Sequence, residues 1–70
     1  MRIDNQKIEG YSGRWYSIDS GIIQGQEYFL LESEEWGDDV PCLIVDSSLN
    51  VVFGNVFNGL WEYKEYLGLV

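Results

Sequence analysis

The sequence contains no histidine, one cysteine and one proline. Without histidine it lacks the commonest general base and the usual partner of a serine or cysteine nucleophile. The lone Cys42 cannot close an internal disulfide, and no histidine or second cysteine accompanies it to build a zinc site. These absences predict a protein that is not an enzyme, carries no metal or other cofactor, and resides in a reducing compartment, the cytoplasm.

Basic residues are scarce as well, with 4 against 12 acidic residues and a net charge of −8. They lie near the two ends of the chain: Arg2, Lys7, Arg14 and Lys64. Nucleic-acid backbones and anionic membranes are bound by lysine and arginine, so this distribution disfavours both as direct partners. It favours basic protein surfaces or divalent cations instead. The alternative is that the charge only keeps a small, aromatic-rich protein soluble.

Long hydrophobic runs are also absent. No apolar segment approaches the roughly 20 residues that span a bilayer, and residues 1–7 lack the apolar core of a signal peptide. The 70 residues predict a single small domain, residues 1–70, near the lower size limit for a core without disulfides or metals. Aromatic packing is the available reinforcement, from 3 Trp, 5 Tyr and 3 Phe. Self-association is another, so a homodimer is an alternative to a monomer.

Four segments have the aromatic and β-branched composition of strands, with turn residues between them. They are residues 14–19, 27–33, 41–45 and 51–57, and residues 22–23 are an alternative extension of the first. Gln24-Gly25 is the expected hairpin turn, the turn-forming residues 46–50 make the loop between the third and fourth segments, and Gly54 marks a bulge or bend. Residues 1–10 fit either a short edge strand or a helical turn.

A short helix is expected after the strands. Asn58 is a good N-cap, Leu60, Tyr63 and Leu67 share one helical face, and Gly68 suits the C′ position. The second and third strand segments are apolar on both faces, which requires a curled sheet or a sheet covered on both sides. The predicted fold class is therefore α+β or mainly β: a curled antiparallel meander of about four strands with a short C-terminal helix.

The loop between the second and third predicted strands concentrates acidic residues around one tryptophan. Its candidate partner-binding residues are Glu32, Glu34, Glu35, Trp36, Asp38 and Asp39. Four basic residues cannot pair with all the acids of the chain, so these carboxylates form a solvated, mutually repelling cluster. Tryptophan is enriched at interface hot spots, and a charged rim steers a basic partner. The alternative is that Trp36 is buried beneath the loop; Trp61, off the apolar line of the helix, raises the same question.

Two other chemistries fit this loop poorly. An EF-hand alignment that begins at Glu32 puts Trp36 at a ligand position and Leu43 where a bidentate glutamate is required. Paired carboxylates such as Glu32 and Glu34 could act as a glycosidase pair, but so short a chain would struggle to build a cleft around them.

The stretch from Tyr28 to Val45, YFLLESEEWGDDVPCLIV, resembles small acidic proteins carried by phages and mobile elements of Gram-positive bacteria. Those proteins share a tyrosine-rich strand, a glutamate, a Gly-Asp-acid loop and a following apolar strand, and Asn58-Gly59 also fits. The resemblance covers about half of the chain. It implies a mobile-element setting and transfers no functional residues.

Charge, size and setting together lead to the hypothesis of a non-enzymatic, acidic protein-binding module. In its sharpest form it is an inhibitor that places carboxylates where phosphates would lie, and so occupies a basic, nucleic-acid-binding surface of a host protein. Compact acidic anti-CRISPR and anti-restriction proteins are similar in overall character. The alternative is a small structural or assembly protein that forms a homo-oligomer through exposed aromatic residues.

Overall fold

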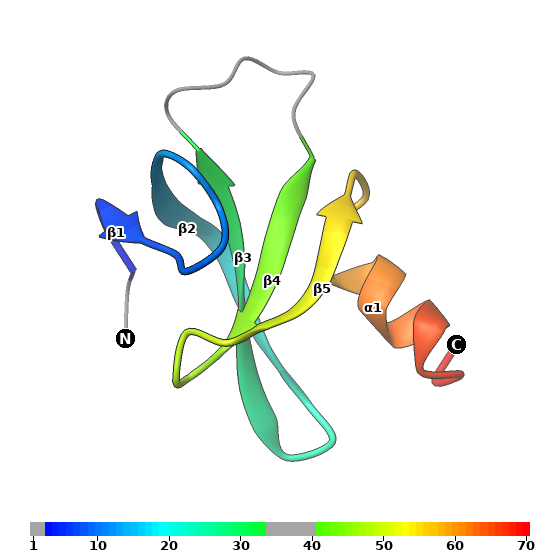
Figure 1. Ribbon diagram of the computed structural model, residues 1–70. Helices are drawn as coiled ribbons and strands as arrows, with labels where there is room; N and C mark the ends of the chain where they lie inside the picture. The colour runs from blue at the N-terminus through cyan, green and yellow to red at the C-terminus, as the bar shows by residue number, and fades with distance from the viewer. Residues whose placement is uncertain (1–2, 34–40) are drawn as a thin grey trace.

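The structure, a computed structural model, describes residues 3–33 and 41–70. Within them the chain forms five strands followed by one helix (Figure 1). The elements are β1 (Gln6–Lys7), β2 (Arg14–Ile23), β3 (Gln26–Ser33), β4 (Cys42–Asp46), β5 (Val51–Val56) and α1 (Leu60–Tyr66).

The strands form one antiparallel sheet in which spatial order follows chain order, β1-β2-β3-β4-β5. The sheet is strongly twisted and curled, and α1 lies beside β5 (Figure 1). This arrangement confirms the predicted curled meander with a C-terminal helix. The described part of the chain adds a strand to the four expected, because the first residues pair with β2.

The N-terminal segment is held against β2 by both backbone and side-chain hydrogen bonds. Ser17 donates its backbone N–H to the Ile3 carbonyl at 2.9 Å, and the Ser17 hydroxyl also donates to that oxygen at 3.1 Å. Further along, Gln6 lies opposite Trp15 in the β1–β2 ladder. Of the two conformations that the sequence left open for residues 1–10, an edge strand and a helical turn, the structure shows the edge strand, at Gln6–Lys7.

The β2–β3 hairpin turns where the sequence predicts. Gln24 and Gly25 have φ values of 52° and 82°, which is the backbone that a two-residue hairpin loop of the primed type requires. β2 itself is longer than the predicted residues 14–19 and continues to Ile23. A register shift between Ser17 and Asp19 leaves Ile18 as an extra residue, so the strand absorbs the irregularity as a bulge and does not end there.

The β4–β5 hairpin carries the predicted loop and the predicted bend. Asp46 ends β4, and its Oδ1 accepts hydrogen bonds from the backbone N–H groups of Ser48 at 2.9 Å and Asn50 at 3.0 Å. The ladder shifts register between Cys42 and Ile44, opposite the stretch of β5 that contains Gly54. Asn55, with φ 61°, turns the strand there. The bulge expected at Gly54 is therefore confirmed.

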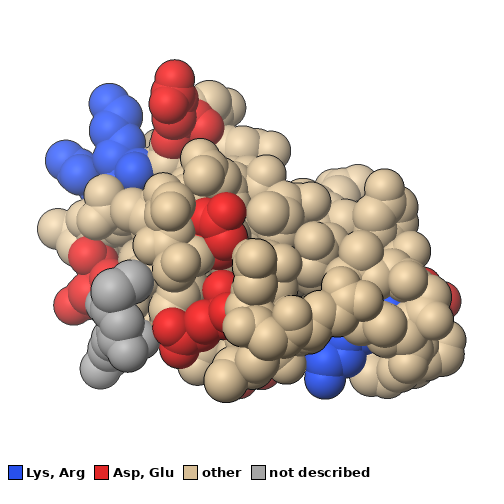
Figure 2. All heavy atoms as spheres, turned by 90° about the horizontal axis from the view of Figure 1, so that it is seen from below, with Lys and Arg blue, Asp and Glu red and all other residues tan. Residues whose placement is uncertain are grey.

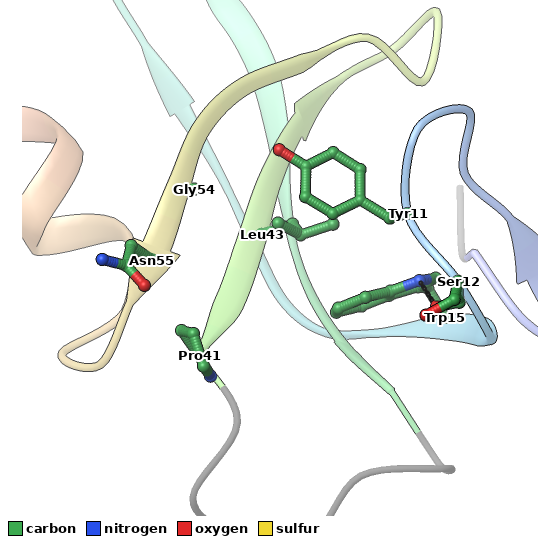
Figure 3. A pocket seen from close by; sticks show the side chains of 7 residues that line it. All are labelled: Tyr11, Ser12, Trp15, Pro41, Leu43, Gly54 and Asn55. Carbon is green, nitrogen blue, oxygen red and sulfur yellow. Dashed lines mark hydrogen bonds between the residues drawn. The ribbon is translucent and has the colours of Figure 1, made fainter.

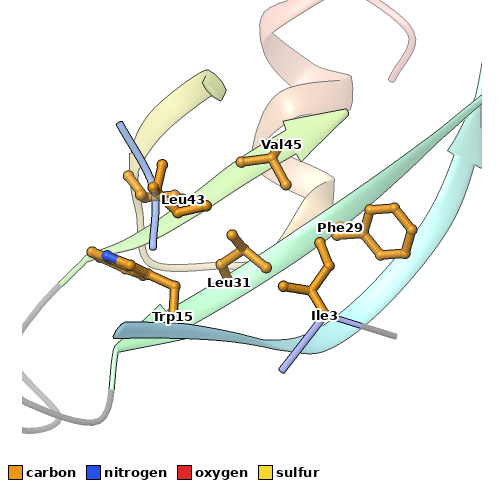
Figure 4. Packing of buried hydrophobic residues seen from close by; sticks show 7 residues of the cluster. Ile3, Trp15, Phe29, Leu31, Leu43 and Val45 are labelled. Carbon is orange, nitrogen blue, oxygen red and sulfur yellow. The ribbon is translucent and has the colours of Figure 1, made fainter. Parts of the chain in front are cut away.

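Both faces of the sheet are buried, as the two-faced apolar strands require. The N-terminal-side cluster lies on one face and includes side chains that β3 and β4 direct towards the N-terminal segment (Figure 4). Its buried members are Ile3, Ile8, Trp15, Phe29, Leu31, Leu43 and Val45. The helix-side cluster lies on the other face, beneath α1. Its buried members are Ile23, Leu30, Ile44, Val56 and Tyr63.

Helix α1 packs through Tyr63, its buried residue, and through the half-buried Leu60. Leu60 also approaches β2, where a Cβ on Gly21 would lie 3.2 Å from the Leu60 Cδ1 atom. Gly21 therefore permits close contact between the helix and the strand. No helix in residues 3–33 and 41–70 is long and apolar enough to cross a membrane.

The cap predicted for the N-terminal end of α1 is wrong, and the one predicted for its C-terminal end is confirmed. The N-cap is Gly59 and not Asn58, because that position has φ 80°, which glycine adopts without strain. At the other end Gly68 occupies C′ as predicted, with φ 78°. Its N–H donates to the Glu65 carbonyl, and the Leu69 N–H donates to the Lys64 carbonyl, which together form a Schellman motif.

Candidate functional site

The structure describes one of the six residues predicted to bind a partner. Glu34, Glu35, Trp36, Asp38 and Asp39 lie outside the described residues. Their role as contact residues therefore stays a prediction. Glu32, the remaining one, lies near the end of β3.

Glu32 is half-buried and lies opposite Tyr16 in the β2–β3 ladder. The Tyr16 hydroxyl donates a hydrogen bond to Glu32 Oε2 at 3.2 Å. A carboxylate with a phenol partner is oriented by that contact, so Glu32 has a fixed position at the edge of the predicted acidic loop.

Cys42, at the start of β4, is a half-buried free thiol. Burial raises the pKa of this thiol above its ordinary value, and the negative charge of Glu32 raises it further. Since the thiolate is the reactive form, Cys42 is poorly activated. Among the described residues no three potential ligands gather into a metal-binding group.

A more prominent surface lies along α1, where aromatic residues are exposed. A groove of about 360 Å³ runs between this helix and β5. We call it the α1 groove, and it is lined by Phe53, Asn55, Asn58, Trp61, Glu62, Glu65 and Tyr66. Trp61 is 55% exposed and Tyr66 is 70% exposed, which answers the question that the sequence raised about Trp61.

The aromatic side of the α1 groove continues into the core. The Tyr66 ring lies 5.1 Å from that of Phe53 and 6.4 Å from that of Tyr63, measured between ring centroids. Tyr63 in turn meets Tyr28 at 5.3 Å in an edge-to-face arrangement. These are favourable separations for aromatic pairs. Tyr66 is thus exposed on one side and held in place on the other.

Two carboxylates lie among these rings. Glu62 accepts a hydrogen bond from the Phe57 backbone N–H at 2.9 Å and another from the Asn58 side-chain amide at 3.3 Å. Glu62 therefore fixes the entry to the helix, where a negative charge is favourable. Glu65 is exposed, and its carboxylate has no hydrogen-bond or ion-pair partner in the part of the chain that the structure describes.

A second hollow lies on the other side of β5 (Figure 3). It has a volume of about 440 Å³ and is mainly apolar, with Trp15, Leu43 and Pro41 among its lining residues. Trp15 is itself buried and donates its indole N–H to the Ser12 carbonyl at 3.2 Å. The Tyr11 ring meets Trp15 edge-to-face at 6.3 Å and points its hydroxyl towards β5. The described lining carries no charged side chain, so it could hold an apolar group but would not select among ligands by charge.

Sequence reasoning singled out Trp61 but missed Tyr66 and Glu65 as its neighbours on one surface. The spacing of these residues along the predicted helix could have indicated that they share a surface with Trp61. Residues four apart on a helix lie on the same face, which pairs Trp61 with Glu65 and Glu62 with Tyr66.

No curated protein and no solved structure matches the chain. A family model does match it over residues 1–66, from the N-terminal segment to the last residue of α1. The description of this family is large polyvalent protein-associated domain 18. Its association is with the large polyvalent proteins of phages and mobile elements, which agrees with the mobile-element setting that the resemblance implied. The chain therefore belongs to the large polyvalent protein-associated domain 18 family.

Proposed function

We propose that the chain is a non-enzymatic, acidic protein-binding module that occupies a basic, nucleic-acid-binding surface of a host protein in the cytoplasm. In this role it would act as an inhibitor for the phage or mobile element that carries it, in the manner of anti-CRISPR or anti-restriction proteins. A Gram-positive host, and acidic character among the related proteins of such elements, belong to the same proposal.

Uncompensated negative charge is the observation that carries this proposal. The net charge is −8, and Lys7, Arg14 and Lys64 contact no carboxylate among the residues that the structure describes. Figure 2 shows acidic side chains spread over the left half of one face, with basic side chains at its upper left and lower edge. Such a surface attracts a basic partner and accelerates association with it.

The contact residues of the proposal are the acidic loop and its tryptophan: Glu32, Glu34, Glu35, Trp36, Asp38 and Asp39. Carboxylates can take the positions of phosphates on a surface of lysines and arginines. Salt screens the attraction between these carboxylates and the lysines and arginines of the host protein, so binding should weaken as the salt concentration rises.

A pull-down from bacterial lysate tests the proposal. We expect one dominant nucleic-acid-handling protein that is lost at high salt and displaced by DNA or RNA. The triple variant E34K/E35K/D38K should lose this partner. A matched triple variant, D4K/E9K/E27K, makes the same charge change at exposed residues away from the loop and should retain it. Equal loss in both variants, or a partner that nucleic acid does not displace, would contradict the proposal.

Exposed aromatic residues favour a second candidate, assembly of the chain with itself. Phe57 is 66% exposed and lies near Trp61 and Tyr66 in the chain. Light scattering distinguishes the two: a concentration-independent dimer that buries Trp61 supports assembly, and a monomer across the concentration range opposes it.

A further inference from the structure

The α1 groove combines two exposed aromatic rings, Trp61 and Tyr66, with the Glu65 carboxylate, which has no partner among the residues that the structure describes. We propose that this groove binds arginine side chains of a basic protein segment. The inference deepens the proposed function, on which it rests, by naming the side chain that the module recognises and a second contact surface for it.

The first reason is the arrangement of the rings. Trp61 and Tyr66 are more than half exposed, so a partner can reach both rings. Tyr66 is nevertheless held by Phe53 at 5.1 Å and by Tyr63 at 6.4 Å. A side chain that is already ordered loses little conformational entropy on binding. Tyr66 is therefore a favourable anchor, and Trp61 adds accessible ring area in the same groove.

The second reason is the placement of the acids beside the rings. Glu65 is four residues after Trp61, and Tyr66 is four residues after Glu62, so each ring has a carboxylate next to it on one helical face. All four side chains line the same groove. The helix's basic residue, Lys64, is not part of that lining and neutralises neither acid within the described residues.

Aromatic rings beside carboxylates suit an arginine side chain better than a lysine side chain or a second copy of this chain. A guanidinium group stacks flat on an aromatic ring and forms directed hydrogen bonds to a carboxylate at the same time. Lysine presents a compact, strongly hydrated charge that uses the ring less well. A second copy of the chain would bring Glu62 and Glu65 of each molecule together, on proteins that each carry a charge of −8.

The experiment is a titration of the ¹⁵N-labelled chain with two synthetic peptides of equal charge, acetyl-(Gly-Arg)₄-amide and acetyl-(Gly-Lys)₄-amide, in about 0.15 M salt. We expect the arginine peptide to shift the NMR signals of the Trp61 indole N–H, the Tyr66 amide and the Asn58 side-chain amide. It should bind at least about threefold more tightly than the lysine peptide, since the ring contacts distinguish the two.

Three variants locate the contact. Trp61→Ala should abolish the preference for arginine, and Glu65→Gln should weaken the arginine peptide several-fold. Glu27→Gln removes the same charge from an exposed position on β3 and should leave the preference unchanged. Both Trp61 and Glu65 are exposed, and a circular dichroism melt checks that the variants remain folded.

Three outcomes would overturn the inference: equal affinity for the two peptides, an equal effect of Glu27→Gln and Glu65→Gln, or self-association that broadens the Trp61 signal without peptide. Its failure is separable from that of the proposed function. If Trp61→Ala captures the lysate partner as well as the unaltered chain does, while E34K/E35K/D38K loses it, the groove is not the contact but the module stands. If no partner is captured, the proposed function itself fails.

Discussion

Glu32 and Cys42 illustrate how one side chain alters the chemistry of a neighbour. Glu32 is oriented by the Tyr16 hydroxyl, and its negative charge opposes ionisation of the Cys42 thiol. The larger cause of the raised thiol pKa is the partial burial of Cys42 itself. The thiolate of Cys42 is therefore less populated at a given pH than that of a free cysteine, which makes the side chain less reactive.

Replacing Glu32 by Gln tests this relation. The charge is removed while the size of the side chain is kept, so the Cys42 pKa should fall and alkylation by iodoacetamide at a fixed pH near 8 should become faster. Glu27→Gln, a control on the same strand, should leave the rate unchanged. An unaltered rate in Glu32→Gln would mean that burial alone determines the reactivity of the thiol.

At the scale of single elements, α1 depends on its two glycine caps. Gly59 and Gly68 both have positive φ, at 80° and 78°, and the helix between them has seven residues. A helix of this length is not stable alone in water and forms because Tyr63 and Leu60 pack on the sheet. The caps satisfy backbone groups that a short helix would otherwise expose.

Gly68→Ala should destabilise the domain by about 1 kcal/mol, because an L-residue at positive φ brings its Cβ close to the backbone. Urea unfolding measures the change. Gly54→Ala is the matched control: that position has no positive φ, and the added Cβ would meet its nearest atoms at an ordinary 3.6 Å. If the two variants lose equal stability, the left-handed backbone at Gly68 is not the cause.

The same elements show which local features can be predicted from sequence. The Gln24-Gly25 turn, the bulge at Gly54 and the C′ role of Gly68 follow from residue types with strong backbone preferences. The N-cap was predicted one residue early, because propensity favours Asn58 and only the chain path shows that Gly59 needs positive φ. Strand β1 was predicted only as one of two alternatives, because its two residues are held by pairing with β2 and carry no strong pattern of their own.

The candidate site was less predictable than the fold. Acidic composition and Trp61 were visible in the sequence, and the helical spacing of Glu65 and Tyr66 could have been used. Phe53 could not have been assigned to the same surface, because its contact with Tyr66 crosses from β5 to α1. Contacts between side chains of different elements can be predicted only once the packing angle of the helix on the sheet is known.

At the scale of the whole molecule, Tyr63 joins the helix to the sheet and links stability to alkaline pH. Burial, followed by a hydrogen bond with the Tyr28 side chain, raises the pKa of Tyr63 above its ordinary value of 10.0. The folded chain thus holds this proton more tightly than the unfolded chain does. The resulting stabilisation is complete below about pH 10 and is lost as the pH rises through the folded-state pKa.

The free energy of unfolding should therefore fall as the pH is raised above about 10, and Tyr63→Phe should make that fall shallower. The substitution also removes the hydrogen bond with Tyr28, so a lower stability at neutral pH is expected as well. Urea unfolding across the alkaline range gives both quantities. Tyr11→Phe, at a more exposed ring, should retain the slope of the unaltered chain. An unchanged slope in Tyr63→Phe would exclude this tyrosine as the source.

The in-order arrangement of the strands has a kinetic consequence. Every ladder joins two strands that are consecutive in the chain, so each can close without waiting for a distant segment. Short loop closures carry a small entropic penalty, and folds built from local pairings cross their transition state quickly. We expect rapid refolding for an all-antiparallel sheet. During synthesis on the ribosome, each hairpin can form as soon as its second strand has emerged, and α1 then docks on strands that are already paired.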